Sequence, residues 1–384
     1  MMERLVVVRG GALGDFILGL PLLDSLRAAM PCAHLTLVGP RAWLPLAWRS
    51  SVDQTMVPLD DPSIAALYAG TPVRLMGGDA HRMATRRRHA PSTGLSSTQG
   101  QAPNEHAPSS WQADEPDLVL ALFRTADRAF ELAWRELGAR RVVWYPPLPP
   151  PDSDLHAIDH LLKILPPLGM QPEVRVPVVE FGAGELAAAA RWCISNTLAD
   201  GGPLVALHPG SGGRWKCWAA ENFGALARRL TREVGARVLL VLGPADEDLV
   251  GPVMAASAEA PVTPVRTTSV RNLAALLRQC TLFIGNDSGV THLAAATGCP
   301  TVALFGPTYD RLWAPVGRHV LMLRGVRGPA LPPDSPAFWP ERPIEADLTV
   351  EDVLVRALDW RSALRMAPDD GTTGMPVARD GGGS

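Results

Sequence analysis

The stretch at residues 283–308, FIGNDSGVTHLAAATGCPTVALFGPT, constrains the fold more than any other part of this 384-residue chain. An apolar run at its start predicts a buried strand, and the Gly-Asn-Asp sequence that follows predicts a turn. Ser288 is placed to cap a helix that Gly298 and Pro300 close. A second apolar run then predicts another buried strand. Strand, helix and strand in this order are typical of an α/β protein.

The turn before this helix is a candidate anion site, because unpaired main-chain amides at a helix start favour a phosphate. Ser288 and His292 are spaced i and i+4, so they share one side of the helix. The opposite side is formed by Val290, Leu293, Ala294 and Thr297. We therefore expect His292 to point away from the core. The alternative is a simple capped helix with a solvated or core-edge histidine.

The composition is that of a soluble globular protein, with 47% hydrophobic and 20% charged residues. A chain of this length exceeds one ordinary core, so we expect two domains. The net charge of -3 argues against a nucleic-acid binder that works through bulk electrostatics. The five cysteines contain no CxxC pair, which indicates a reducing compartment and argues against a cysteine-based zinc site. No apolar run approaches the ~18 residues that span a bilayer, so a cytoplasmic location is expected.

A strand at residues 5–8 leads into RGGALGD at residues 9–15, and a helical pattern then continues to Ala29. The glycines suggest a dinucleotide-binding loop, but GxGxxG would need a glycine where Arg9 stands. Asp15 is instead expected at the carboxyl end of the first strand, where open α/β sheets bind ligands. The alternative is an aspartate that only caps the helix.

We expect a first domain at residues 1–180, a second at 181–365, and a disordered tail at 366–384. Within the first domain, residues 77–116 lose long aliphatic side chains and fill with polar residues and proline, which predicts a mobile insertion. This segment contains an arginine cluster formed by Arg82, Arg86, Arg87 and Arg88. Such a run is either a solvated charge cluster or a contact for an anionic acceptor or lipid surface.

Three loops of the second domain each follow a predicted strand and carry polar residues. They contain Ser211 with Lys216, then Asp246, then residues 287–292. The carboxyl ends of parallel strands lie at one edge of a sheet, so we expect these loops to meet there. Lysine is scarce, since only Lys163 and Lys216 occur among 36 basic residues. Lys216, in a Gly-rich loop, is either a surface lysine or a phosphate contact.

Four segments together resemble the motifs of glycosyltransferase family 9, the ADP-heptose:lipopolysaccharide heptosyltransferases. They are RGGALGDFILGLP at 9–21, HPGSGGRWKCW at 208–218, LGPADED at 242–248 and GNDSGVTHLAAATGCPTVALFGPT at 285–308. Their order and spacing extend through roughly residues 3 to 310. The resemblance implies the GT-B fold, in which two Rossmann-like, doubly wound domains face a cleft. It also implies an inverting transfer of heptose or a related sugar from a nucleotide-diphosphate donor to a lipopolysaccharide core or similar glycan, without a metal or other cofactor.

The resemblance also implies roles for individual residues. Asp15 stands where the family has its general base, and Asp246 where an acidic residue holds the ribose. The residues that match contacts to the donor phosphates or sugar are Ser211, Lys216, Asp287, Ser288, Gly289 and His292. The acceptor is expected on the first domain, near Gly14 and the arginine cluster. The chain departs from the family in having Gly10 and Gly11 ahead of the Gly-Asp pair, which bears on the acceptor.

Two other function classes fit part of the pattern. A nucleotide-sugar epimerase can share the two-domain fold, but it needs acid and base groups around the donor sugar. A non-catalytic nucleotide-sugar-binding protein would have no use for Asp15. For the transferase, the expected partners are a nucleotide-sugar donor and a lipid-linked saccharide acceptor, with peripheral contact to the inner membrane face and no nucleic acid.

Overall fold

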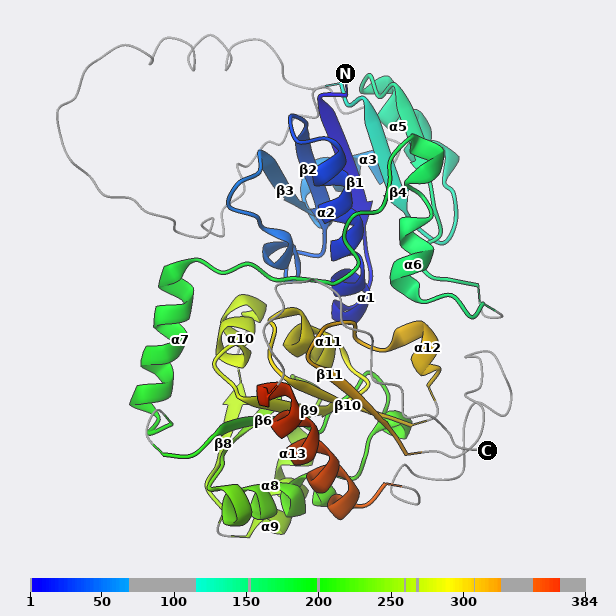
Figure 1. Ribbon diagram of the computed structural model, residues 1–384. Helices are drawn as coiled ribbons and strands as arrows, with labels where there is room; N and C mark the ends of the chain where they lie inside the picture. The colour runs from blue at the N-terminus through cyan, green and yellow to red at the C-terminus, as the bar shows by residue number, and fades with distance from the viewer. Residues whose placement is uncertain are drawn as a thin grey trace, which may run out of the picture.

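The computed structural model describes residues 2–68, 115–150, 153–198, 201–258, 260–266, 269–306, 308–325 and 348–366. They form two α/β domains, each built on a parallel sheet (Figure 1). In the described part of the chain, no helix is both long and apolar enough to cross a bilayer.

The first domain contains a five-stranded sheet of order β3-β2-β1-β4-β5, in which all neighbours are parallel. Its strands are β1 (Arg4–Arg9), β2 (His34–Gly39), β3 (Gln54–Pro58), β4 (Leu118–Leu122) and β5 (Arg141–Trp144). Its helices are α1 (Leu13–Leu18), α2 (Leu20–Ala29), α3 (Pro62–Tyr68), α5 (Arg128–Glu136) and α6 (Ala157–Leu162), with short 3-10 helices η1 (Leu44–Ala47) and η3 (Pro166–Leu168). The inner strands β1, β2 and β4 are mostly aliphatic, because both faces of the sheet are covered.

The second domain contains a six-stranded parallel sheet of order β11-β10-β9-β6-β7-β8. Its strands are β6 (Leu204–His208), β7 (Arg237–Leu242), β8 (Val262–Arg266), β9 (Leu282–Asn286), β10 (Thr301–Phe305) and β11 (Val320–Arg324). Its helices are α7 (Ala183–Ser195), α8 (Ala220–Val234), α9 (Glu247–Ser257), α10 (Val270–Leu277), α11 (Gly289–Ala296), α12 (Asp310–Trp313) and α13 (Val350–Met366), with the 3-10 helix η4 (Arg214–Lys216).

Both sheets are doubly wound, as the sequence predicts. The strand order reverses between β1 and β4 in the first sheet and between β6 and β9 in the second. Ligands of such sheets bind beyond the carboxyl ends of the strands at these reversals. The loops after β1, β6 and β9 therefore occupy the binding edges of the two domains.

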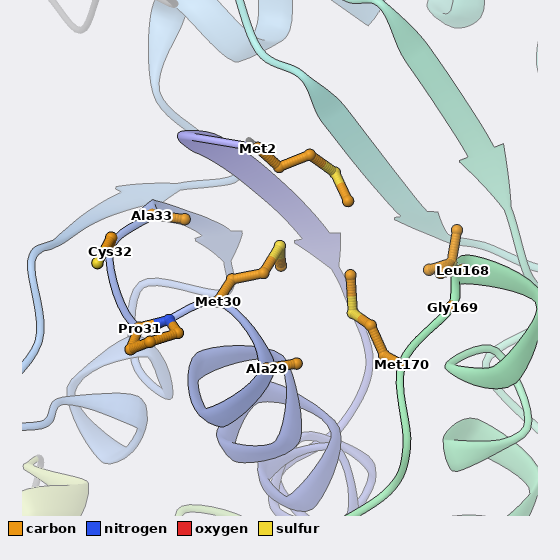
Figure 2. Close-up of a pocket in the computed structure, with 9 residues that line it drawn as sticks. All are labelled: Met2, Ala29, Met30, Pro31, Cys32, Ala33, Leu168, Gly169 and Met170. Atoms are coloured by element: carbon orange, nitrogen blue, oxygen red, sulfur yellow. The ribbon is translucent and has the colours of Figure 1, made fainter.

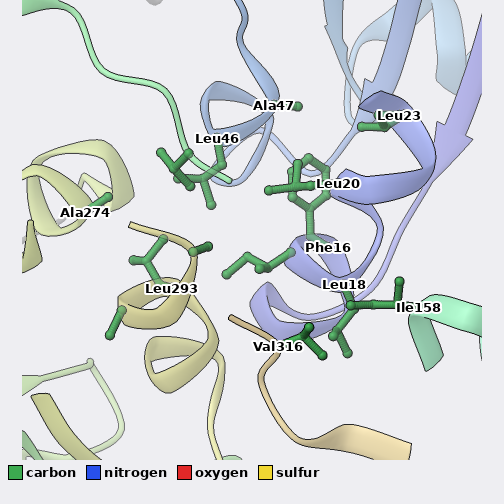
Figure 3. Close-up of a cluster of buried hydrophobic side chains, with 14 of the residues drawn as sticks. Phe16, Leu18, Leu20, Leu23, Leu46, Ala47, Ile158, Ala274, Leu293 and Val316 are labelled. Atoms are coloured by element: carbon green, nitrogen blue, oxygen red, sulfur yellow. The ribbon is translucent and has the colours of Figure 1, made fainter. Parts of the chain in front are cut away.

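One hydrophobic cluster joins the two domains. Phe16 and Leu18 of α1 lie in the same buried cluster as Leu293 of α11 and Val316 (Figure 3). Side chains from η1 and α10 extend this cluster. In Figure 1, α1 lies directly against α11. The apolar face of α1 is thus buried between the domains, which holds the loop after β1 against the second domain.

Polar contacts add to this interface. Arg271 of α10 pairs with Glu185 and also donates to the main-chain oxygen of Pro45, 3.1 Å away. His156 Nε2 lies 2.9 Å from the main-chain oxygen of Ala314. The hydroxyl of Tyr309 donates to the carboxylate of Asp154. These bonds connect residues far apart in the sequence and align the two binding edges.

The helix after β1 differs from the sequence prediction. The pattern predicts one helix to Ala29, but the structure divides it into α1 and α2 at Gly19. Pro21, in the first turn of α2, has no amide proton to donate to the preceding turn. The break ends α1 after six residues.

A hollow lies at the amino end of the first sheet, far from the loops described above. It is lined by Met2, Ala29, Met30, Pro31, Cys32, Ala33, Leu168, Gly169 and Met170 (Figure 2). Because parallel sheets bind ligands at the carboxyl ends of their strands, this hollow is not at the candidate site.

Candidate functional site

The turn after β1 places Asp15 at the carboxyl end of that strand. Gly11 adopts a φ of +106°, and a Cβ there would lie 3.2 Å from Asp15 Oδ2. Asp15 is the third residue of α1, and its Oδ2 accepts a hydrogen bond of 3.3 Å from the Ala12 amide. The residue at the cap position is Ala12, so Asp15 is not a simple N-cap. Its carboxylate instead folds back on the turn.

The start of α11 is held by its own side chains. Ser288 Oγ accepts from the Thr291 amide at 3.2 Å, which confirms the predicted cap. Asn286 bridges to the loop after β6, donating to the Pro209 oxygen at 2.8 Å and accepting from the Trp218 amide at 3.0 Å. These bonds fix the Gly-rich loop beside the first turn of α11.

The predicted donor residues of these two loops come together. Ser211 Oγ donates to the Asp287 main-chain oxygen at 2.6 Å. Lys216 Nζ lies 3.2 Å from Asp287 Oδ2. Ser288 and Gly289 follow directly at the start of α11. A lysine ammonium and a helix N-terminus thus occur side by side, which is the chemistry that binds a diphosphate.

Asp246 is buried at the end of the loop after β7, with 5% of its surface exposed. Its Oδ2 accepts from the Gly243 amide at 2.8 Å. A Cβ on Gly210 would lie 2.3 Å from its Oδ1, so the glycine allows the loops after β6 and β7 to approach closely. Burial lowers the pKa of nearby His208, and the charge of Asp246 opposes that shift.

His292 is buried against the first domain and is not a solvated histidine. His292 is 6% exposed and faces α1, since a Cβ on Gly14 would lie 3.2 Å from its Cδ2. A Cβ on Gly289 would lie 3.0 Å from the Gly14 amide nitrogen, so the two helix starts touch through glycines. The side of α11 opposite its own core is covered by the other domain. Burial lowers the pKa of His292 to about 4, so the ring is neutral at pH 7.

Two arginines of the site were not singled out from the sequence. Arg214, beside Lys216 in the Gly-rich loop, donates to the Ala245 oxygen at 2.6 Å and to Asp248 at 2.5 Å. Arg9 lies buried beneath Asp15 and is treated below. Two sequence features could have identified them. Arg214 lies in the Gly-rich loop beside Lys216, and Arg9 is a charged residue at the end of a buried strand. The predicted acceptor residues Arg82, Arg86, Arg87 and Arg88 lie outside the described residues.

The acidic side chains Asp15, Asp246 and Asp287 each take part in a hydrogen bond or an ion pair. Across the described ranges, no group of three or more His, Cys, Asp or Glu residues could hold a metal ion. The groups arranged to meet a negative ligand are Lys216 and the amides at the start of α11. Asp15 lies on the facing side, one residue from the Gly14 that contacts His292.

Residues 181–332 match the model of glycosyltransferase family 9 (heptosyltransferase). Lipopolysaccharide heptosyltransferase 3 of Escherichia coli K12 is 27% identical over 180 residues, which are 44% of this chain and 50% of that protein. Lipopolysaccharide heptosyltransferase 2 of Salmonella typhimurium is 27% identical over 157 residues, 40% of this chain and 44% of that protein. The chain thus spans about half the length of the curated relatives it matches.

Two solved structures share the architecture of nearly the whole chain. A family 9 glycosyl transferase from Veillonella parvula superposes with a TM-score of 0.69 at 22% identity, covering 94% of this chain and 97% of that one. The E. coli ADP-heptose lps heptosyltransferase II gives a TM-score of 0.65 at 18% identity, covering 95% and 100%. The GT-B fold is confirmed. The family model thus matches residues 181–332, and the two solved structures show that the shared fold extends over nearly the whole chain.

Proposed function

We propose that the chain is an inverting glycosyltransferase that moves heptose from ADP-heptose to a lipopolysaccharide core or similar glycan. One observation carries the proposal. The start of α11, with Lys216 beside it, packs against the start of α1, which bears Asp15. A diphosphate-binding group and a carboxylate therefore face one another between the domains. The names of the relatives, lipopolysaccharide heptosyltransferases, support the choice of donor and acceptor.

The geometry supports a single displacement at the anomeric carbon. The acceptor hydroxyl oxygen attacks that carbon and forms the new glycosidic bond, while Asp15 takes the hydroxyl proton. The bond from the anomeric carbon to the diphosphate oxygen breaks, and its electron pair leaves with ADP. Attack opposite to the leaving group inverts the configuration. Lys216 and the first amides of α11 stabilise the charge that develops on the diphosphate.

The remaining donor residues orient the nucleotide. Asp246 accepts one hydrogen bond from the Gly243 amide, and further lone pairs of its carboxylate can accept ribose hydroxyls. Ser211 holds the Asp287 carbonyl, which keeps the loop after β9 in place beneath the phosphates. The lipid-linked acceptor would reach the first domain from a membrane surface, with the chain in peripheral contact.

The test is a product analysis on the full chain. Purified protein is incubated with ADP-heptose, with and without a deacylated lipopolysaccharide core that lacks the terminal heptose, and the products are read by mass spectrometry. We expect ADP and a glycan heavier by one heptose, formed only with acceptor. NMR of the new linkage is expected to give the inverted anomer.

Other outcomes would favour the alternative classes. An altered nucleotide sugar formed without acceptor would identify an epimerase. Tight binding of ADP-heptose without turnover on a series of core acceptors would identify a binding protein. A thermal-shift series with ADP-, UDP- and GDP-linked sugars, run in parallel, reports the donor base independently of the acceptor.

A further inference from the structure

Arg9, the last residue of β1, is a charged residue inside the first domain. Its surface is only 2% exposed. Burial lowers its pKa to about 10, and the negative charge of Asp15 opposes that shift, so the guanidinium is charged at pH 7. Its Nε and Nη1 are buried and have no hydrogen-bond partner within the described ranges. A buried charge with unmet donors is costly, which calls for a reason to keep it there.

The third nitrogen of the guanidinium, Nη2, has a hydrogen-bond partner in α1. Arg9 Nη2 donates a hydrogen bond to the main-chain oxygen of Asp15. Because α1 is only six residues long and breaks at Gly19, the Asp15 carbonyl is among the last four of that helix. Carbonyls at a helix end need a partner from elsewhere, and a cation there also meets the helix dipole. Arg9 supplies both.

Gly19 makes room for the guanidinium. A Cβ at this position would lie 2.7 Å from Arg9 Nε and 2.9 Å from its Cζ. The backbone of Gly19 has φ -86°, which any residue adopts. The position therefore needs glycine for space and not for conformation. The arginine side chain occupies the space beside Gly19, at the break between α1 and α2.

Asp15 is consequently held at two points. The Ala12 amide contacts its carboxylate at 3.3 Å, and Arg9 holds its carbonyl from the core side. On the other side of α1, Gly14 abuts His292 of the second domain. The carboxylate thus has a buried, fixed positive charge behind it and the donor-binding loops in front.

We propose that Arg9 is the positioning residue of Asp15: it fixes the first helical turn after β1 and supplies a buried positive charge behind the carboxylate that takes the acceptor proton. Arg9 touches neither donor nor acceptor and acts only through Asp15. This inference rests on the proposed function and deepens it.

The test compares variants that remove or displace the guanidinium. Arg9→Met keeps an unbranched side chain in place of the aliphatic part of the arginine but removes the guanidinium, with its charge and its bond to Asp15. We expect kcat for heptose transfer from ADP-heptose to the deacylated core to fall by about 10- to 100-fold, with KM for the donor within about twofold. Gly19→Ala leaves Arg9 in the chain but crowds the guanidinium, and we expect a loss of kcat in the same direction.

Two comparisons separate this role from a general effect on folding. Gly251→Ala on α9 is the matched control, because a Cβ there meets nothing within 4 Å, and its kcat is expected to equal that of the wild type. In an Asp15→Asn background, Arg9→Met is expected to change the residual kcat by less than about threefold, since residues that act as a unit are not additive.

Three results would overturn the assignment. The first is a wild-type kcat in both Arg9→Met and Gly19→Ala. The second is a full loss for Arg9→Met in the Asp15→Asn background, which would show that Arg9 acts independently of Asp15. If Arg9→Met does not fold, Gly19→Ala alone and in the Asp15→Asn background decides the question. The third is a wild-type chain that transfers no heptose at all. That result would refute the proposed function itself, and the inactive wild type distinguishes it from a failure of the Arg9 assignment alone.

Discussion

Lys216 Nζ lies 3.2 Å from Asp287 Oδ2, across 71 positions of sequence. The pair joins the loop after β6 to the loop after β9, and the Asp287 side chain is only 8% exposed. With Ser211 bonded to the Asp287 carbonyl, the lysine is held at the start of α11 and not free on the surface. If Lys216 binds the donor as proposed, it is preorganised before any nucleotide sugar arrives.

Removing this cation is expected to weaken donor binding. Lys216→Met deletes the positive charge and leaves the buried Asp287 carboxylate facing the incoming diphosphate. We expect the Kd for ADP-heptose to rise by about 10- to 100-fold, or about 1.4 to 2.8 kcal/mol. Isothermal titration calorimetry measures it. Lys163→Met is the control, because Lys163 is the chain's other lysine and is exposed in the first domain. Equal Kd values for the two variants would contradict the assignment.

Replacing the proposed base is expected to affect turnover and not donor binding. Asp15→Asn keeps the size of the side chain and its acceptor oxygen toward the Ala12 amide, but it cannot take a proton at pH 7. We expect kcat to fall by about 10²- to 10⁴-fold, with the Kd for ADP-heptose within about twofold. Asp359→Asn, on the exposed side of α13, is the matched control. Near-normal turnover in Asp15→Asn would remove Asp15 from the mechanism.

The sequence is informative where local chemistry decides the structure. Aliphatic runs fix the strands, and Ser288 caps α11 as expected, because the cap bond lies within four residues. The loops after β6 and β9 meet because parallel strands end at a common edge. These features need no knowledge of the other domain.

The sequence fails where a second domain changes the environment. The face of α11 that carries His292 looks solvent-exposed from its periodicity, yet α1 covers it. The space that Gly19 leaves is occupied by the side chain of Arg9, ten residues earlier and in the preceding strand. Arg214 looks like an ordinary loop cation until its bonds to Ala245 and Asp248 are seen. Helical periodicity reports one helix at a time and contains no information on packing between domains.

Chelators are expected to leave transfer intact. In the proposed mechanism, Lys216 and the amides at the start of α11 supply positive charge where the diphosphate leaves. We expect the initial rate in excess EDTA to be within about twofold of the untreated rate. The measurement is ADP release with and without chelator, followed by addition of Mg²⁺ or Mn²⁺. Complete loss in EDTA that either ion restores would refute metal-independent transfer.

Protonation of His292 is expected to destabilise the fold in acid. Burial lowers the pKa of His292 to about 4 in the folded chain, against 6.5 for a solvent-exposed histidine, so the unfolded chain binds the proton more tightly. Between these two pKa values the unfolded state holds more protons, and the free energy of unfolding therefore falls as pH falls. The free energy of unfolding decreases by about 3 kcal/mol in total. This decrease is absent above pH 6.5 and complete below pH 4. His156, His160 and His208 have pKa values lowered by burial as well and add to the same trend.

A variant isolates the share of His292. Urea unfolding is followed from pH 7.5 to pH 4.5 for the wild type and for His292→Gln, which cannot titrate. We expect the free energy of unfolding to fall less steeply with acid in His292→Gln, whatever its value at pH 7.5. Val316→Ala, which thins the same shared cluster without removing a titrating group, is expected to lie below the wild type by a constant amount. Parallel curves for the wild type and His292→Gln would mean that His292 has the same pKa in the folded and the unfolded chain. Burial against α1 would then not lower the pKa of the imidazole.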